Sequence, residues 1–214
     1  MTDDVDSFNF DSLLSDHIDA LQELGNIGSG HAANALADLL NRRIDMSLPR
    51  FQKLTTSEIS TFKWKDKNPE SIFAVVILET KGELSLNTLI VFDEDTLNAL
   101  IRIIRDLNED VDMTKLSSLD QSIISEVGNI LSLHFVTSIY TFLGVKGMPS
   151  TPVLVIEKSE TILTSLATHY SEDFTDLLLI ECDIFAANTK LNPLVILAPE
   201  PKSVEITLSK MFGV

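Results

Sequence analysis

Apolar residues recur every three or four positions in two long stretches of this 214-residue chain. Residues 12–41 carry Leu21, Leu24 and Ile27 at this spacing, and residues 118–143 carry the matching pattern. A period of about 3.6 residues is typical of an amphipathic helix with one buried side. The pattern therefore predicts two long helices, one near the start of each half of the chain.

Shorter apolar runs rich in β-branched residues follow each predicted helix, and such runs favour strands. In the first half, strands are predicted at residues 51–62, 71–79 and 84–92. In the second half, strands are predicted at residues 152–157, 161–168, 175–185 and 193–198.

The remaining segments are predicted from their turn and capping residues. A helix is expected to start at Asp93, and Pro199 introduces a final helix that ends near Gly213. Residues 63–70 form a predicted surface loop, and the polar residues 105–117 join the two halves.

One sparse polar pattern occurs twice. The first copy is Asp19, Glu23, Asn26 and Pro49. The second copy is Ser122, Glu126, Asn129 and Pro152, and each member lies 103 positions after its counterpart. Nine of the 31 positions in residues 19–49 are identical to those in residues 122–152. The chain therefore contains an internal repeat, with halves at about 12–107 and 115–214.

This repeat also predicts the fold class. Two long helices and strands of mainly antiparallel order favour an α+β protein. We expect residues 1–214 to form a single domain of two halves related by a pseudo-two-fold axis, with a mainly antiparallel sheet packed against the two motif helices.

The chain is acidic, with a formal net charge of -16 and no Lys or Arg before Arg42. Nucleic acids and anionic membranes are disfavoured as partners, because both require clustered cations. A basic protein surface fits better, although solubility in a salty cytoplasm would also explain the charge. No apolar stretch is expected to span a bilayer, and the N-terminus lacks the basic residues of a signal peptide. We therefore expect a cytoplasmic protein without membrane insertion.

On a helix the first three motif residues share one face. Relative to Asp19, Glu23 lies about 40° round the axis and Asn26 about 20° the other way. Gly25 and Gly128 precede the two Asn residues, and the missing side chains would let another backbone or protein come close. Two alternatives are that Gly25–Asn26 caps a helix end, and that the polar residues are merely solvated. Apolar periodicity that continues beyond both Asn residues argues against the cap.

The motif contains no strong nucleophile. His31 and His134 are interpreted as packed or capping residues, and Cys182 as a buried small apolar residue. The sequence shows no metal-ligand set, Ser-His-Asp arrangement, glycine-rich phosphate loop or CxxC motif. A carboxamide can orient a water molecule, and a carboxylate can bind a cation. This chemistry suits hydrolysis of a bond that another protein has already activated.

These residues resemble the CheC family of chemotaxis phosphatases, which share the motif [Asp/Ser]-x3-Glu-x2-Asn-x22-Pro. The segments ELGNIGSGHAANAL and SEVGNILS are similar to the two motif helices of that family. The resemblance implies hydrolysis of the aspartyl phosphate on the response regulator CheY. Asn26 or Asn129 would orient the attacking water, and Glu23 or Glu126 would pair with a lysine of the regulator.

The resemblance implies supporting roles for the other four motif residues. Asp19 and Ser122 would support the helix or the contact, and Pro49 and Pro152 would shape the turn into the next strand. No cofactor of its own is expected, since the regulator would bring Mg²⁺. The receptor deamidase CheD is implied as a second partner.

The two motif helices differ beside their sites. Leu131 and Leu133 stand where the first half has Gly28 and Gly30, so the second helix is expected to be stiffer and more apolar. The sequence does not rank the two sites.

Two other functions remain open at this stage. The chain could be a non-catalytic interaction module, an adaptor for a deamidase or for a flagellar switch, because relatives with this fold bind without catalysis. It could also be a small-molecule hydrolase with a Glu base, although no oxyanion donors accompany the glutamates.

Overall fold

The protein is described by a computed structural model that covers residues 10–55, 58, 68–170, 176–186 and 189–200. The helices are α1 (Phe10–Leu40), α3 (Glu94–Arg105), the 3-10 turn η1 (Met113–Lys115), α4 (Ser118–Leu143) and α5 (Ser159–Tyr170). The strands are β1 (Ile44–Met46), β2 (Arg50–Thr55), β3 (Ile72–Gly82), β4 (Leu86–Phe92), β5 (Gly147–Pro149), β6 (Val153–Lys158), β7 (Asp176–Glu181), β8 (Ile184–Ala186), β9 (Thr189–Leu191) and β10 (Leu194–Pro199).

Seven strands form one antiparallel sheet in the order β2-β7-β10-β4-β3-β5, with β6 also paired to β3. A smaller sheet has the order β1-β8-β9. The predicted α+β class with a mainly antiparallel sheet is confirmed. Both motif helices end at equivalent positions, and β5 and β6 begin and end 103 residues after β1 and β2.

The sheet order shows how the two halves combine. β2 and β1 of the first half pair with β7 and β8 of the second, while β6 and β5 of the second half pair with β3 of the first. The order β2-β7-β10 from one edge matches β6-β3-β4 from the other. The pseudo-two-fold axis therefore passes between β10 and β4. The first two strands of each half pair with strands of the other half.

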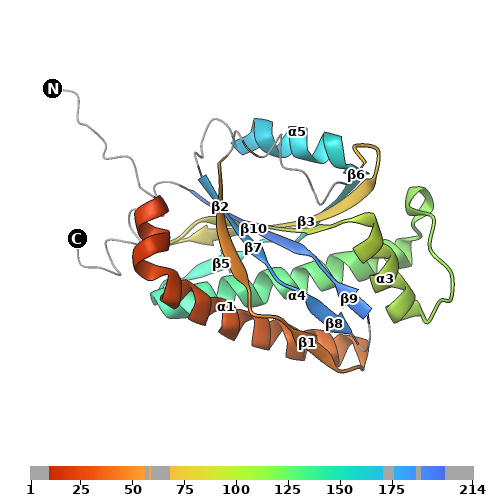
Figure 1. The fold of residues 1–214 in the computed structure, drawn as a ribbon, viewed down its shortest axis with the longest axis horizontal. Coiled ribbons are helices and arrows are strands. Elements are labelled where there is room, and N and C mark those ends of the chain that lie inside the picture. Colours follow the sequence, from red (N-terminus) through yellow and green to blue (C-terminus); the bar gives the residue numbers. More distant parts are fainter. Residues whose placement is uncertain (1–9, 56–57, 59–67, 171–175, 187–188, 201–214) are drawn as a thin grey trace.

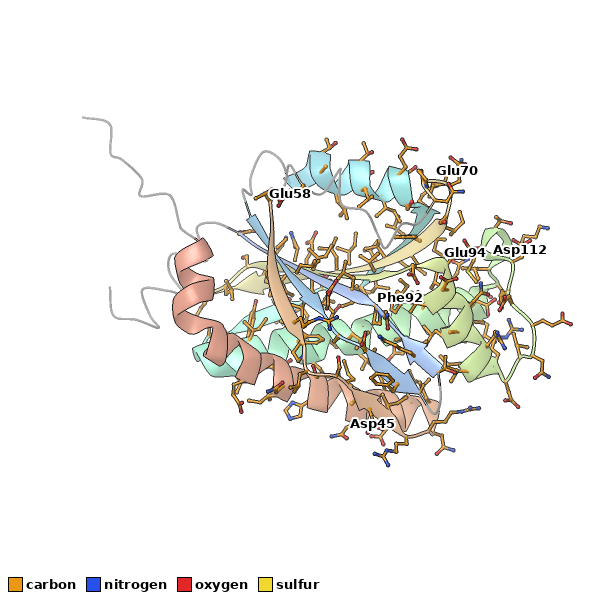
Figure 2. The ribbon with its side chains drawn as sticks, in the orientation of Figure 1. Asp45, Glu58, Glu70, Phe92, Glu94 and Asp112 are labelled. Atoms are coloured by element: carbon orange, nitrogen blue, oxygen red, sulfur yellow. The ribbon has the colours of Figure 1, made fainter. Side chains whose placement is uncertain are left out.

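The sheet is covered on both faces, with α1 and α4 on one side and α5 on the other (Figure 1). Ala74 and Val76 of β3 belong to the core under α4, whereas Phe73 and Val75 belong to the core under α5. Phe92 of β4 lies in the interior, between the sheet and the helix pair (Figure 2). Burial on both faces explains why the central strands are continuous apolar runs.

Several predicted elements differ in the structure. Residues 161–168, predicted as a strand, lie within helix α5, where Ile162 and Leu166 are buried against the sheet at i and i+4. The prediction was wrong because the β-branched residues of this segment outweighed its helical spacing. The strand predicted at 175–185 is divided into β7 and β8, and β2 ends earlier than predicted. The final helix predicted after Pro199 lies outside the described residues.

The start of α4 is fixed by a buried carboxylate. Asp120 accepts hydrogen bonds from the backbone N–H and hydroxyl of Ser117, which caps the helix, and pairs with Arg105 of α3 at 2.8 Å. Burial alone would raise the pKa of Asp120, but the hydrogen bonds from Ser117 and the charge of Arg105 lower it overall. This contact ties the end of α3 to the beginning of the second motif helix. The predicted helix start at Asp93 is also confirmed, because its side chain accepts from the Thr96 N–H.

Helix α4 has the predicted bounds, but it is more apolar than the sequence analysis expected. Residues Ser118–Thr141 have a mean hydropathy of 1.2 and sufficient length to cross a membrane, so the prediction that no stretch reaches this length was wrong. Of this window, 44% is buried inside the protein. A core helix passes the same test of length and composition, and the contacts of α4 with β3 and α1 account for its apolar character.

Three glycines of the motif helices have different surroundings. A Cβ on Gly128 would lie 2.5 Å from Cβ of Val76 in β3, and one on Gly28 would lie 3.2 Å from the Phe135 ring of α4. A Cβ on Gly30 would meet nothing within 4 Å. Gly128 and Gly28 therefore permit close packing between elements, whereas packing does not require a glycine at position 30.

We expect Gly128→Ala and Gly30→Ala to change stability in opposite directions. Gly128→Ala should lower the free energy of unfolding by about 1–3 kcal/mol, because the new methyl group overlaps Val76. Gly30→Ala should raise it by about 0.5–1 kcal/mol, because alanine favours the helix and has room. Urea unfolding of both variants would measure the two effects. Destabilisation of equal size in both would show that packing on β3 is not the cause.

Candidate functional site

Both motif helices continue without interruption through their Asn residues. The alternative that Gly25–Asn26 ends a helix is therefore wrong. The side chains of Glu23, Asn26 and Glu126 are exposed, and that of Asn129 is half-buried. The side chain of Asp19 lies outside the described side chains, although its backbone belongs to α1.

The two motif helices pack side by side in antiparallel directions (Figure 1). Gly28 faces Phe135 and Ser138, whereas His31, further along α1, faces His134, which is earlier on α4. His31 and His134 are equivalent positions of the repeat, and their ring centroids are 6.2 Å apart. The pseudo-two-fold axis therefore passes between these two rings.

This arrangement separates the two motif copies. Each Asn lies five residues before the histidine of its own helix, which is about 7.5 Å along the axis. Because the helices are antiparallel, Asn26 and Asn129 lie on opposite sides of the crossing and about 15 Å apart along the helix direction. The two copies form two separate sites on the helix pair, with one Glu/Asn pair each.

The four central motif side chains make no polar contact with the described part of the chain. These residues are Glu23, Asn26, Glu126 and Asn129, and none of them forms a hydrogen bond or ion pair with a described residue. Ser122, in contrast, donates its hydroxyl to the backbone carbonyl of Ser118 at 2.9 Å. The Glu and Asn side chains are therefore available to another molecule, while Ser122 contacts its own helix.

The two motif prolines each precede an outer strand of the main sheet. Pro49 is buried directly before β2, and Pro152 is half-buried directly before β6. Each proline therefore stands at the entry to the strand that follows it.

The serines two positions before the prolines make a contact that the sequence analysis missed. The Ser47 N–H donates to the Asp183 carbonyl at 2.8 Å, and the Ser47 hydroxyl accepts from the Asp183 N–H at 2.9 Å. Ser150 makes the same pair of bonds with Glu79, at 2.7 and 3.2 Å. Both serines were among the nine identical positions, and that identity was the available signal. Ser150 fixes the second half of the chain to strand β3 of the first half, and Ser47 fixes the first half to the connection between β7 and β8 of the second.

The glycines before the motif Asn residues do not leave space for a partner. Gly25 and Gly128 are both buried, and Val76 of β3 fills the space beside Gly128. Of the two alternatives expected at Gly128, another backbone or another protein, the structure shows the first, because strand β3 of the same chain comes close there. Close packing on the sheet holds the helix so that the following residue, Asn129, projects from a rigid backbone.

The other titratable candidates differ in burial: Cys182 is buried, His134 is half-buried and His31 is exposed. Cys182 is 2% exposed, and burial raises the pKa of its thiol to about 12, which confirms its interpretation as an apolar residue. Burial lowers the pKa of His134, and the nearby His31 lowers it further. Among the residues that the structure describes, no three His, Cys, Asp or Glu side chains gather as a metal site. The chemistry that remains available is the positioning of small groups by Asn and Glu.

The chain is similar to a known family and to two known proteins. Residues 17–52, which contain the whole first motif, match the CheC-like family. The CheY-P phosphatase CheC of Bacillus subtilis is 27% identical over 178 residues, 82% of this chain and 83% of that protein. The flagellar motor switch phosphatase FliY of the same organism is 35% identical over 85 residues, 40% of this chain and 21% of that protein.

A crystal structure shows the same fold. Thermotoga maritima FliY superposes with a TM-score of 0.69 at 22% identity, over 91% of this chain and 97% of that chain.

We expect the imidazole of His134 to make stability depend on pH. Its pKa is lowered from 6.5 in the folded state, so the unfolded chain binds the proton first as the pH falls. The free energy of unfolding should therefore decrease as the pH falls below about 6.5, and level off once the folded imidazole is also protonated. His134→Asn should flatten this part of the profile, and His31→Asn should flatten it partly. Urea unfolding between pH 5 and 8 is the measurement, and an unchanged slope in His134→Asn would contradict the assignment.

Proposed function

We propose that the chain is a member of the CheC-like family and that it hydrolyses the aspartyl phosphate of a CheY-type response regulator. The similarity of residues 17–52 to that family and of most of the chain to CheC of Bacillus subtilis supports this proposal. The observation that carries the proposal is the pair of Glu/Asn sites on the two motif helices, whose side chains have no partner within the described part of the chain. A substrate that is already activated needs a correctly placed water molecule more than it needs a nucleophile.

The amide of Asn26 or Asn129 has the properties needed to orient that water. A carboxamide both donates and accepts hydrogen bonds, so it can fix the position and direction of a water molecule. The water attacks phosphorus, the bond from phosphorus to the aspartyl oxygen breaks, and inorganic phosphate leaves with a free Asp carboxylate on the regulator. Mg²⁺ bound by the regulator would stabilise the charge of the phosphoryl group.

Glu23 and Glu126 would bring the regulator into place. Each lies one helical turn before its Asn and on the same face, so a lysine beside the phosphoryl site of the regulator can reach it. An exposed carboxylate in an acidic protein also attracts a basic surface over a distance. The separation of the two copies means that each Glu/Asn pair acts on one phosphoryl group by itself.

Two further parts of the proposal come from the family resemblance alone. We propose CheD as a second partner, and the cytoplasm, where response regulators act, as the location. The adaptor function is the alternative that the experiment below distinguishes.

We expect wild-type protein to accelerate phosphate release from the phosphorylated cognate regulator, and the double variant Asn26→Ala/Asn129→Ala to lose this acceleration. Removal of an amide that orients water should raise the barrier by about 2–4 kcal/mol at its site. Phosphate release at equal protein concentration is the measurement, and the single variants rank the two sites.

Asn34→Ala is the matched control, because Asn34 is also an exposed Asn of α1 but lies outside the motif. It should retain wild-type activity. No acceleration by the wild type, with and without CheD, would reject the phosphatase and favour the adaptor function.

We expect Glu23→Gln and Glu126→Gln to weaken the binding of the phosphorylated regulator more than they slow the hydrolysis step. Loss of the carboxylate should raise KM for the phosphorylated regulator by up to about tenfold and should reduce its dependence on salt. Asp38→Asn removes an equal charge from the same helix at an exposed position outside the motif, and it should leave KM unchanged. KM at several ionic strengths is the measurement, and equal effects of Asp38→Asn and Glu23→Gln would contradict a specific pairing.

A further inference from the structure

Three glycines of α1 and α4 were compared above, namely Gly28, Gly30 and Gly128. Packing requires glycine at the first and third of these positions but does not require it at Gly30. Gly28 and Gly128 are required by the close approach of Phe135 and Val76. Gly30 is exposed, and a Cβ there would meet nothing within 4 Å. Glycine in the middle of a helix is less stable than alanine, so a role outside packing is needed to account for it.

The position of Gly30 relative to Asn26 suggests that role. Side chains on a helix point back toward its N-terminus and cover the surface of the preceding turn. A side chain at position 30 would therefore lie over the residue four positions earlier, which is Asn26. With glycine at this position, the amide of Asn26 is left uncovered.

The second motif helix has the opposite arrangement. Leu133 is the counterpart of Gly30, and by the same geometry it leans over Asn129. The exposures of the two Asn side chains agree with this difference, since Asn26 is exposed and Asn129 is half-buried.

We propose that the residue four positions after the motif Asn controls access to its amide: Gly30 keeps the α1 site open, and Leu133 restricts the α4 site. Applied to the proposed phosphatase function, on which this step rests, the α1 site carries most of the activity. Gly30 and Leu133 control access to the Asn amide and do not contact the reacting atoms. Their effect is therefore on the binding of the regulator.

The first experiment measures access without any regulator. Asn26→Cys and Asn129→Cys variants are treated with a maleimide, and the labelling rates are compared. The Cys at position 26 should react faster, Gly30→Leu should slow it several-fold, and Leu133→Ala should speed labelling at position 129. The native Cys182 contributes little, because it is buried and its pKa is raised. Equal labelling at both positions, or no response to Gly30→Leu, would overturn the proposal.

The second experiment measures the consequence for catalysis in single-site backgrounds. With Asn129→Ala present, Gly30→Leu should lower kcat/KM by about tenfold or more, mainly through KM. With Asn26→Ala present, Gly30→Leu should have no effect, and Leu133→Ala should raise kcat/KM. Thermal unfolding of each variant checks the fold, and Gly30→Ala should be more stable than wild type while its α1 site becomes slower.

The two experiments separate the failure of this proposal from failure of the proposed function. If wild-type protein fails to accelerate hydrolysis but labelling follows the expected pattern, the phosphatase function is rejected and the access role of Gly30 stands. If hydrolysis is accelerated but Gly30→Leu leaves it unchanged in the Asn129→Ala background, the access role is rejected and the function stands.

Discussion

The close approach of α4 to β3 is the contact on which the rest of the structure depends. Gly128 lies against Val76 with no room for a methyl group, and Gly28 allows α1 to pack closely against Phe135 of α4. These contacts fix the rotation of both helices about their own axes. Once that rotation is fixed, the face opposite the sheet is fixed as well, and it is the face that carries Glu23, Asn26 and Glu126. Core packing and site geometry therefore share one cause.

Much of this arrangement could be predicted from the sequence, because it follows from the periodic spacing of apolar residues and from the internal repeat. The two long helices, the central strands and the motif faces follow from apolar spacing and from a repeat of 103 residues. The helix α5 could not be predicted in the same way, since its β-branched residues favour a strand locally and only packing against the sheet selects the helix.

The site was predictable in its residues but less so in its surroundings. The sequence left open whether another backbone or another protein approaches Gly128, because a sequence does not reveal which neighbour fills the space beside a glycine. The Ser47 and Ser150 contacts with Asp183 and Glu79 were missed for a related reason: each joins residues that are far apart in the chain. Pattern analysis detects what repeats along a helix or strand, whereas contacts between elements need the fold.

The exchange of outer strands between the halves has a consequence for how the chain folds during synthesis. β2 pairs with β7, and Arg50 meets its partner Glu181 from a position 131 residues earlier. A ribosome therefore releases β2 long before the strand that completes its hydrogen bonds exists, and an unpaired edge is open to association with other chains. Contacts of such long sequence separation also slow folding. The two halves therefore resemble strand-swapped partners within one chain, and β2 has no partner strand until β7 has been synthesised. Nascent chains are most prone to aggregation during that interval.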